Sequence, residues 1–280
     1  MKILVTGANG YIGSNVVRQL LDLGNEVVAC DINTDNIDPR AVVIKYDIFH
    51  CSDEDDMFAT FGKPDVCLHL AWRDGFIHNS QRHMHDLSLH YGFLTNLINH
   101  GLRHLAIMGT MHEVGYHEGV IDENTPCNPT TLYSISKNAL RQSVMLYAAQ
   151  NNCTLQWLRA FYIYGDDLKN HSIFTKLLEA AKRGDKTFPF NTGKNQYDFM
   201  PVTELVKQIA AAILQDKVNG IINCCTGKPV PLYVAVENFI KKNNLNITLN
   251  YGAFPDRPYD SPCIYGDNTK IKQIMNESHA

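Results

Sequence analysis

The chain has 280 residues, of which 45% are hydrophobic and 19% are charged, and its formal net charge is −4. A chain of this length and composition can bury a full hydrophobic core, as one large domain or as a domain with a small appendage. Its Lys and Arg residues are scattered rather than clustered, which argues against a nucleic-acid partner or an anionic membrane surface and favours small-molecule ligands.

Strand-like and helix-like segments alternate from the start of the chain, a pattern typical of the α/β class with a doubly wound parallel sheet. Apolar runs predict strands at residues 2–6, 26–30, 41–46, 65–71, 103–109 and 154–160. Helical periodicity predicts helices at residues 11–23, 52–60, 79–100, 129–151, 171–183 and 202–215. No apolar run approaches the ~20 residues that a membrane helix needs, and the first strand leads directly into a loop, so we expect a cytoplasmic protein with no membrane partner.

A glycine-rich loop separates the first predicted strand from the first predicted helix. Glycine at its first two positions permits a tight turn and a close approach of the backbone to a ligand, and the third allows helix and strand to pack closely. The N-terminus of the following helix directs N–H groups at a pyrophosphate. This context predicts a Rossmann dinucleotide site. The cofactor-binding residues predicted in the loop are Gly7, Asn9, Gly10, Tyr11, Ile12 and Gly13.

Acidic residues end the second and third predicted strands. Asp31 lies where a carboxylate can accept both hydroxyls of an adenine ribose, and it would repel a 2′-phosphate, so the predicted cofactor is NAD rather than NADP. Asp47 can meet the adenine amino group, although a solvated carboxylate at a strand end fits this position equally well. The other cofactor-binding residues of the prediction are Ile48, Leu70, Ala71 and Lys137.

Histidines and cysteines are numerous, but neither predicts a metal site. Four histidines lie in one segment, His78, His83, His85 and His90. If residues 79–100 are helical, this spacing does not bring three of them together with a carboxylate, so we expect no metal. The eight cysteines include no Cys-x-x-Cys pair, and several lie in apolar strand-like runs, so we expect reduced core residues.

A tyrosine and a lysine stand one helical turn apart, as Tyr133 and Lys137. Removing a hydride from an alcohol requires a base for the hydroxyl proton, and the reverse reduction requires an acid. Tyr133 can do both if its pKa falls by roughly three units from ~10, which needs about 4 kcal/mol of preferential phenolate stabilisation. The ammonium of Lys137, on the same helix face, can supply much of it. The pair therefore predicts hydride-transfer chemistry.

Pro and Gly recur after residue 164, and the alternation of strands and helices loosens there. We predict that residues 1–164 and 201–224 form the NAD-binding Rossmann domain. Residues 165–200 and 225–280 are predicted to form a smaller substrate-binding region toward the C-terminus.

Short landmarks follow one another in order over nearly the whole chain: residues 6–13, His69-Leu70-Ala71, Thr110, Glu123, Pro129, Tyr133-x-x-x-Lys137, residues 158–165, Asp198-Phe199, Asn223 and Arg257. Together they resemble the extended short-chain dehydrogenase/reductase family, in its NAD-dependent epimerase/dehydratase branch that acts on nucleotide sugars. The resemblance implies a nucleotide-diphosphate sugar as partner and a homodimer formed through the helices near 79–100 and 129–151. It also implies that Thr110 hydrogen-bonds the reacting oxygen and that Lys137 binds the nicotinamide ribose, which makes Thr110, Tyr133 and Lys137 the predicted catalytic residues.

The segment from Thr110 to Gly115 bears on the reaction type. The sugar-nucleotide 4,6-dehydratases have Thr-Asp-Glu-x-x-Gly there, whereas this chain has Met111-His112 in place of the acid and base. Dehydration is therefore disfavoured unless Glu113 reaches in from one position later. The 4-epimerases and the 4-keto-6-deoxysugar reductases need only Thr, Tyr and Lys. We predict an NAD-dependent enzyme that transfers a hydride at hexose C4, as one or the other.

Two alternatives stay open. His112 and His171 fall near the positions where the GDP-fucose synthases carry the Cys and His that exchange protons at sugar C3 and C5, so an epimerase/reductase of that kind is one. A non-catalytic NAD(P)-binding sensor is the other, although it would need no Thr/Tyr/Lys set. The chain also departs from the family at Trp72, where small residues are usual, and this ring could stack on a ligand or pack in the core. The predicted substrate-binding residues are His112, Tyr162, His171, Tyr197 and Arg257.

Overall fold

A seven-stranded parallel sheet forms the centre of the protein. The computed structural model describes residues 1–165, 168, 170, 172–256 and 260–278. The strand order is β12-β7-β5-β4-β1-β2-β3, and every pairing in it is parallel. The strands are β1 (Lys2–Thr6), β2 (Glu26–Asp31), β3 (Val42–Lys45), β4 (Val66–His69), β5 (His104–Thr110), β7 (Thr154–Ala160) and β12 (Gly220–Cys224). The chain order reverses between β1 and β4, and ligands bind at such a switch point in open α/β sheets. The predicted doubly wound sheet is confirmed.

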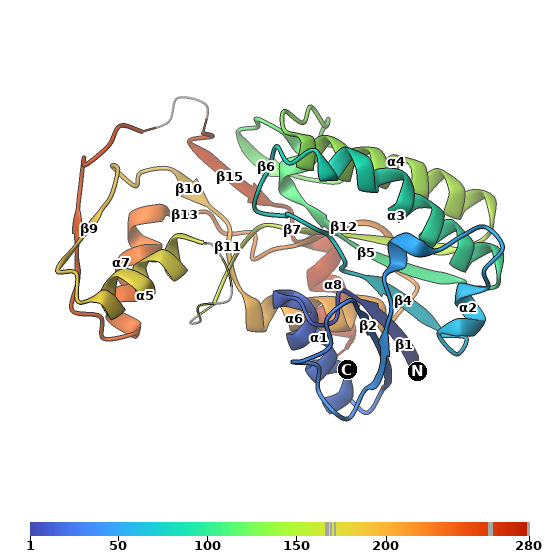
Figure 1. Cartoon of the computed structure of the whole chain (residues 1–280). Coiled ribbons are helices and arrows are strands. Elements are labelled where there is room, and N and C mark those ends of the chain that lie inside the picture. Colours follow the sequence, from blue (N-terminus) through green and yellow to red (C-terminus); the bar gives the residue numbers. More distant parts are fainter. Residues whose placement is uncertain (166–167, 169, 171, 257–259, 279–280) are drawn as a thin grey trace.

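Helices cover both faces of this sheet (Figure 1). One face carries α1 (Tyr11–Asp22), α6 (Val202–Ile213) and α8 (Thr269–Glu277), and the other carries α2 (Met57–Thr60), α3 (Arg82–Asn99) and α4 (Leu132–Gln150). Side chains of a strand alternate between the faces. In β1, accordingly, Ile3 and Val5 join the first core cluster while Leu4 joins the second. Both faces are covered, which explains why the strands read as continuous apolar runs.

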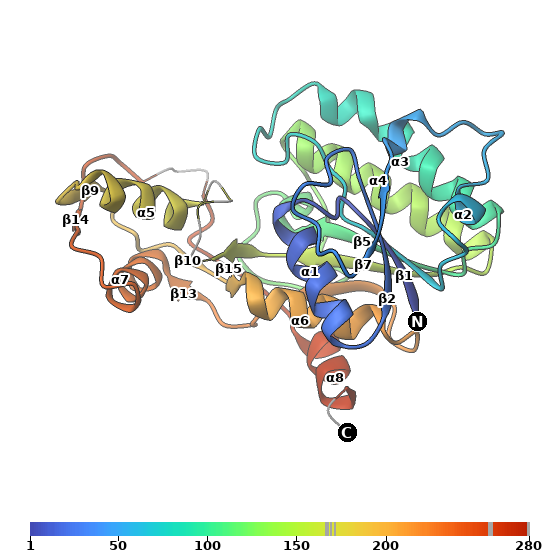
Figure 2. The same ribbon diagram turned by 60° about the horizontal axis from the view of Figure 1, so that its bottom comes forward.

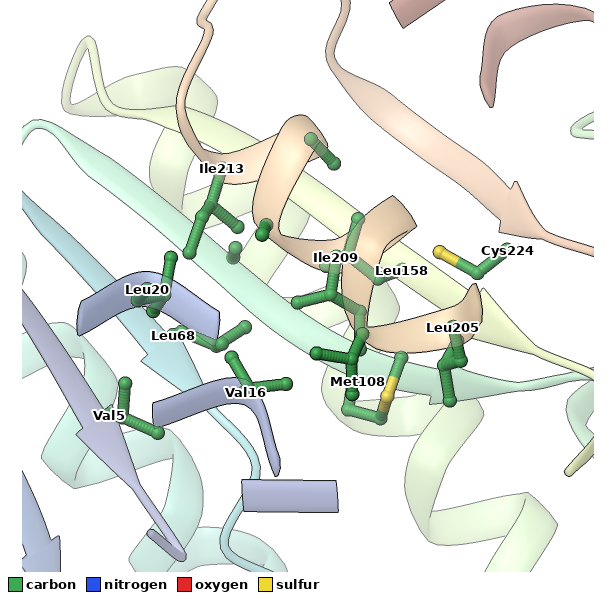
Figure 3. Packing of buried hydrophobic residues seen from close by; sticks show 14 of the residues in the cluster. Val5, Val16, Leu20, Leu68, Met108, Leu158, Leu205, Ile209, Ile213 and Cys224 are labelled. Carbon is green, nitrogen blue, oxygen red and sulfur yellow. The ribbon is translucent and has the colours of Figure 1, made fainter. Parts of the chain in front are cut away.

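The first of these clusters is shown in Figure 3, where Val5, Leu68 and Met108 of the sheet meet side chains of α1 and α6. Val16 and Leu20 come from α1 at helical spacing. Packing of α1 and α6 against the sheet fixes the start of α1, and therefore the glycine-rich loop, over the carboxyl end of β1.

Two of the predicted helices begin several residues later in the structure, and one strand of the central sheet was not predicted. The helix predicted at 52–60 is only α2, because Ser52 donates to the side chain of Asp55 and Asp56 caps the helix by accepting from Ala59 N. The helix α4 begins at Leu132, since the Thr131 hydroxyl accepts from Ser134 N. The strand β12 was not among the six predicted, although its residues lie within the segment assigned to the NAD-binding domain.

A small lobe lies beyond the carboxyl ends of the central strands (Figure 2). We use this name for α5 (Ile173–Arg183), α7 (Leu232–Lys242), β9 (Thr187–Pro189) and β14 (Thr248–Asn250). They have a core cluster of their own, which includes Phe174, Leu177, Phe190, Val236 and Phe239.

Short strands connect the small lobe to the central sheet. A four-stranded sheet has the order β13-β10-β15-β6, and β11 pairs with β8. Their bounds are β6 (Gly119–Ile121), β8 (Tyr162–Tyr164), β10 (Gln196–Tyr197), β11 (Phe199–Pro201), β13 (Val230–Pro231) and β15 (Cys263–Gly266). The division of the chain into a Rossmann domain and a substrate-binding region stays a prediction.

Among the described residues, no helix combines the length and apolar character needed to span a bilayer.

Candidate active site

The glycine-rich loop forms a cradle at the carboxyl end of β1. Gly7 has a φ of +70°, and a Cβ there would lie 2.6 Å from the backbone N of Ala71. A Cβ on Gly13 would lie 2.1 Å from the Gly7 carbonyl oxygen. Only glycine therefore lets the loop, the helix α1 and the end of β4 approach this closely. Gly10 is the N-cap of α1 and supplies no capping side chain, and the first N–H groups of a helix can bind an anion, so the residues present fit a dinucleotide.

One cavity extends from this cradle over the ends of β2 and β3. Its lining includes all five cofactor-binding residues that were predicted at the ends of β2, β3 and β4: Asp31, Asp47, Ile48, Leu70 and Ala71. Gly7, Gly10, Tyr46 and Trp72 line the same cavity. The Asp31 carboxylate accepts from the backbone N–H groups of Asn9 and Asn33, at 3.0 and 3.2 Å. Asn9 thus holds Asp31 in place and is not among the residues that line the cavity.

Asp31→Ser is expected to lower NAD affinity about tenfold, because it removes a charge-assisted acceptor at the ribose end of the cavity. It is also expected to reduce the preference for NADH over NADPH, because the carboxylate no longer repels a 2′-phosphate. Fluorescence titration with NADH and NADPH measures both dissociation constants. The control is Asp35→Ser, an exposed carboxylate of the same loop. Equal losses in the two variants would contradict the role of Asp31.

The three predicted catalytic residues come together at a second cavity. Thr110 ends β5, and Tyr133 and Lys137 stand one turn apart in α4. All three line this cavity with Gly10, Tyr11, Ile12 and Gly13 of the loop. The start of α4 is tied to the loop before α3, because Tyr133 N donates to the carbonyl of His78 at 2.8 Å. Thr110, Tyr133 and the cofactor loop therefore share one volume.

Burial raises the pKa of Tyr133 to about 12, which is opposite to the fall that its role required in the sequence analysis. A hydrogen bond with the Thr110 side chain acts in the opposite direction, and the charge of Glu113 adds to the rise. Burial also lowers the pKa of Lys137 to about 7, although Glu113 favours its charged form. The Lys137 ammonium donates to the Met108 carbonyl at 2.7 Å and lies 3.9 Å from the centroid of the Trp72 ring. Titratable groups shifted by burial in a cleft are typical of functional sites.

Glu113 does not reach the cavities of this site. Its side chain is fully buried, and its Oε1 accepts from Thr110 N at 3.0 Å and from Trp157 Nε1 at 2.7 Å. Ion pairs with Arg141 and Arg159 complete its surroundings, at 2.9 and 3.8 Å. Glu113 lines neither the catalytic cavity nor its neighbour. The exception that the sequence left open for dehydration is therefore not met.

A third cavity, adjoining the catalytic one, lies between the Rossmann sheet and the small lobe. His112, Tyr162 and Tyr197 line it, and His112 and Tyr162 also line the catalytic cavity. Burial, reinforced by the nearby His78, lowers the pKa of His112 to about 4. The rings of Tyr162 and Tyr197 lie 4.4 Å apart between centroids and form an aromatic wall. The other two predicted substrate-binding residues, His171 and Arg257, lie outside the described residues.

His78 is a cavity residue that the sequence prediction missed. Its ring stacks on Tyr133 with a centroid distance of 5.5 Å and lies 5.2 Å from His112. It lines both the catalytic cavity and the adjoining one. The sequence drew attention to His78 only as a possible metal ligand, and its placement in the loop before α3 is a tertiary feature. Within the described ranges, no group of three His, Cys, Asp or Glu side chains could hold a metal ion.

Comparisons with known proteins agree with this geometry. Residues 3–225 match the NAD dependent epimerase/dehydratase family. The chain is 43% identical to dTDP-6-deoxy-L-talose 4-dehydrogenase (NAD(+)) of Aggregatibacter actinomycetemcomitans, over 95% of this chain and 99% of that relative. It resembles the structure of Thermotoga maritima UDP-glucose 4-epimerase with UDP-glucose, at TM-score 0.82 and 22% identity, over 98% of this chain and 92% of that one. It also resembles Thermus thermophilus UDP-glucose 4-epimerase in complex with NAD, at TM-score 0.77 and 20% identity, over 99% and 93%.

The matched residues include the glycine-rich loop, Thr110, Tyr133 and Lys137. The chain therefore belongs to the NAD-dependent epimerase/dehydratase family, within the extended short-chain dehydrogenases/reductases, and it is an NAD-dependent enzyme.

Proposed function

We propose that this protein oxidises the C4 hydroxyl of a deoxythymidine-diphospho-6-deoxyhexose to a ketone, reversibly, with NAD⁺ as hydride acceptor. The observation that carries the proposal is the meeting of Tyr133, Thr110 and Lys137 with the glycine-rich loop in one cavity. The substrate class rests on the relative that is 43% identical over nearly the full length of both chains, whose name specifies a dTDP-6-deoxy sugar and C4 oxidation.

The roles of the side chains follow from their positions. The Tyr133 phenolate takes the proton of the C4 hydroxyl, and the Thr110 hydroxyl donates to the same oxygen. The Lys137 ammonium, which lines the same cavity, favours the phenolate over the neutral phenol. NAD⁺, when bound, accepts the hydride that leaves C4. In the reverse direction Tyr133 returns its proton to the forming alkoxide.

The sugar and nucleotide are proposed to occupy the adjoining cavity. Tyr162 and Tyr197 supply an aromatic wall, and His112 stands at its junction with the catalytic cavity. With its lowered pKa, His112 is neutral at pH 7 and can donate or accept a hydrogen bond to a sugar hydroxyl. His171 and Arg257 stay in the proposal as substrate-binding residues on the strength of the sequence alone.

The proposal is tested by incubating the purified protein with NAD⁺ and dTDP-6-deoxy-L-talose. We expect one NADH, read by its absorbance, for each 4-keto sugar formed, and slower turnover with NADP⁺. Parallel reactions contain UDP-glucose and the dTDP-4-keto-6-deoxy sugar with NADH. Conversion of UDP-glucose to its C4 epimer without net NADH, and no reaction with the dTDP sugars, would replace this proposal with a 4-epimerase.

We also propose that two copies associate through α3 and α4. Leu140 and Val144 of α4 are buried in the core, whereas Leu146 and Ile135 of α4 and Leu89 of α3 are exposed. These exposed apolar side chains on two packed helices favour a helical interface. Light scattering should give twice the chain mass of 31.6 kDa. A monomeric mass at micromolar concentration would contradict the dimer. The cytoplasmic location stays a prediction.

A further inference from the structure

The ring of Trp72 stands at the meeting point of the cofactor loop, α3 and α4. Trp72 follows β4 and lines both the cavity beside Asp31 and the catalytic cavity. The Lys137 ammonium lies 3.9 Å from the centroid of its ring. The Tyr133 ring meets it edge to face, with centroids 6.0 Å apart. This one side chain therefore contacts both the proton-transfer tyrosine and its lysine.

Two histidines of α3 orient the indole. His83 and His90 are seven residues apart, two helical turns, so they share one face of the helix. Trp72 Nε1 donates to His83 Nδ1 at 3.1 Å, and His83 Nε2 in turn contacts the carbonyl of Ile77 at 3.0 Å. The ring of His90 stacks on the indole, at 4.4 Å between centroids and 9° between planes.

A buried chain of hydrogen bonds anchors His90 to the sheet. His90 Nδ1 lies 2.9 Å from His69 Nε2, and His69 Nδ1 lies 2.8 Å from the Thr6 hydroxyl. Burial lowers the pKa of His69 to about 3 and holds the pKa of His90 well below its usual range, so both rings are neutral at pH 7. The stack on His90 therefore adds no positive charge beside Lys137.

The indole ring of Trp72 stabilises the positive charge of the buried Lys137 ammonium. An ammonium has three donors, and the hydrogen bond of Lys137 to the Met108 carbonyl uses one of them. The charged and titratable groups around it are Tyr133, Glu113, His69 and His90, of which Glu113 alone favours its charge. An indole face attracts a buried ammonium more strongly than any other aromatic side chain.

We propose that Trp72, oriented by His83 and His90, is a positioning residue that holds the charged Lys137 ammonium in the catalytic cavity through a cation–π contact. The proposal gives the histidine-rich segment a role without metal binding. Its effect on turnover rests on the proposed function, whereas the contact itself can be observed without substrate.

Two substitutions of Trp72 distinguish the effect of its aromatic face from the effect of its size. Trp72→Leu is expected to lower kcat about 30-fold, which is the equivalent of ~2 kcal/mol for a desolvated cation–π contact. Trp72→Phe keeps an aromatic face and should lose only about fivefold. Thermal unfolding establishes that both variants are folded. Equal losses in Leu and Phe, or a Leu variant with nearly full kcat, would overturn the proposal.

Fluorine NMR tests the contact without turnover and without a substitution at Trp72. The chain has two tryptophans, so 5-fluorotryptophan labelling gives two signals, and Trp157→Phe assigns them. We expect Lys137→Met and added NAD⁺ each to move the Trp72 signal more than the Trp157 signal. A Trp72 signal that ignores Lys137→Met would refute the contact, even if the C4 oxidation is confirmed. If instead the sugar assay fails, a responsive Trp72 signal still supports the contact.

Discussion

Replacing Tyr133 with phenylalanine is expected to lower kcat for C4 oxidation about 10³-fold, within the range that a positioned acid–base group contributes. The substitution removes only the hydroxyl, so the ring keeps its stack on His78 and its edge contact with Trp72. The cofactor cradle lies on other elements. NADH affinity, measured by fluorescence titration, should therefore change less than about threefold, which is the usual effect of a substitution that removes no important contact.

The pH dependence gives a second measure of the same residue. Burial raises the Tyr133 pKa to about 12, so the phenol of the free enzyme is protonated at neutral pH. Oxidation needs the deprotonated form and reduction needs the protonated one. The oxidation rate should therefore rise with pH above 7, whereas the reduction rate should stay level until the pH approaches about 12. Tyr133→Phe should abolish the rising limb.

A matched control comes from the same helix. The Tyr147 hydroxyl donates to the Asn99 side chain at 2.6 Å, outside the cavities. Tyr147→Phe removes an identical group and should leave kcat unchanged. If Tyr133→Phe retained a tenth or more of the wild-type kcat, the assignment of Tyr133 as acid and base would be wrong.

The sequence predicts the cofactor half of the site because that half is built from local motifs. Gly7 needs glycine for its positive φ, and a Cβ on Gly13 would clash with the Gly7 carbonyl of the same loop. Asp31 follows at the end of the next strand, and parallel strands end at the same edge of the sheet. The strand, the loop, the helix and the carboxylate all lie within residues 2–31, so one continuous segment is enough to predict them.

The small lobe and the edge of the sheet are harder to predict for a physical reason. Strands of two or three residues such as β10 and β13 are too short to show alternation. The strand β12, Gly220–Cys224, is followed by a segment with Gly227, Pro229 and Pro231 rather than by a clear helical pattern. Such elements form because partners from elsewhere pair with them, and no local signal records those partners.

The surroundings of the catalytic groups are also hard to predict, because they are formed by residues that are far apart in the sequence. The spacing of His83 and His90 shows a shared helix face but not the indole that packs on it. Glu113 is adjacent to the Thr110 loop in sequence, yet its partners Arg141 and Arg159 come from α4 and β7. The sequence left open whether Glu113 enters the site. In the structure it lines neither cavity and instead accepts a hydrogen bond from the backbone N of the catalytic Thr110.

Replacing Glu113 with glutamine is expected to lower the free energy of unfolding by about 3 kcal/mol, because it breaks a buried ion pair by removing one partner. Glutamine can still accept from Thr110 N and Trp157 Nε1, so shape and hydrogen bonding are largely kept. The lost charge is the one that offsets Arg159, a fully buried side chain whose pKa burial lowers. Calorimetry should show a fall in melting temperature of roughly 5 °C.

The control for this effect is an exposed carboxylate of the same chemistry. Glu123 pairs with Lys270 where both side chains are partly exposed, and Glu123→Gln should cost less than about 1 kcal/mol. Glu113→Leu extends the series, because it also leaves the Thr110 N–H without its acceptor and should lower kcat as well as stability. Melting temperatures of Glu113→Gln and Glu123→Gln that fall equally would contradict the role of Glu113. An ordered series in stability, with kcat lost mainly in Glu113→Leu, would separate its charge from its support of the catalytic threonine.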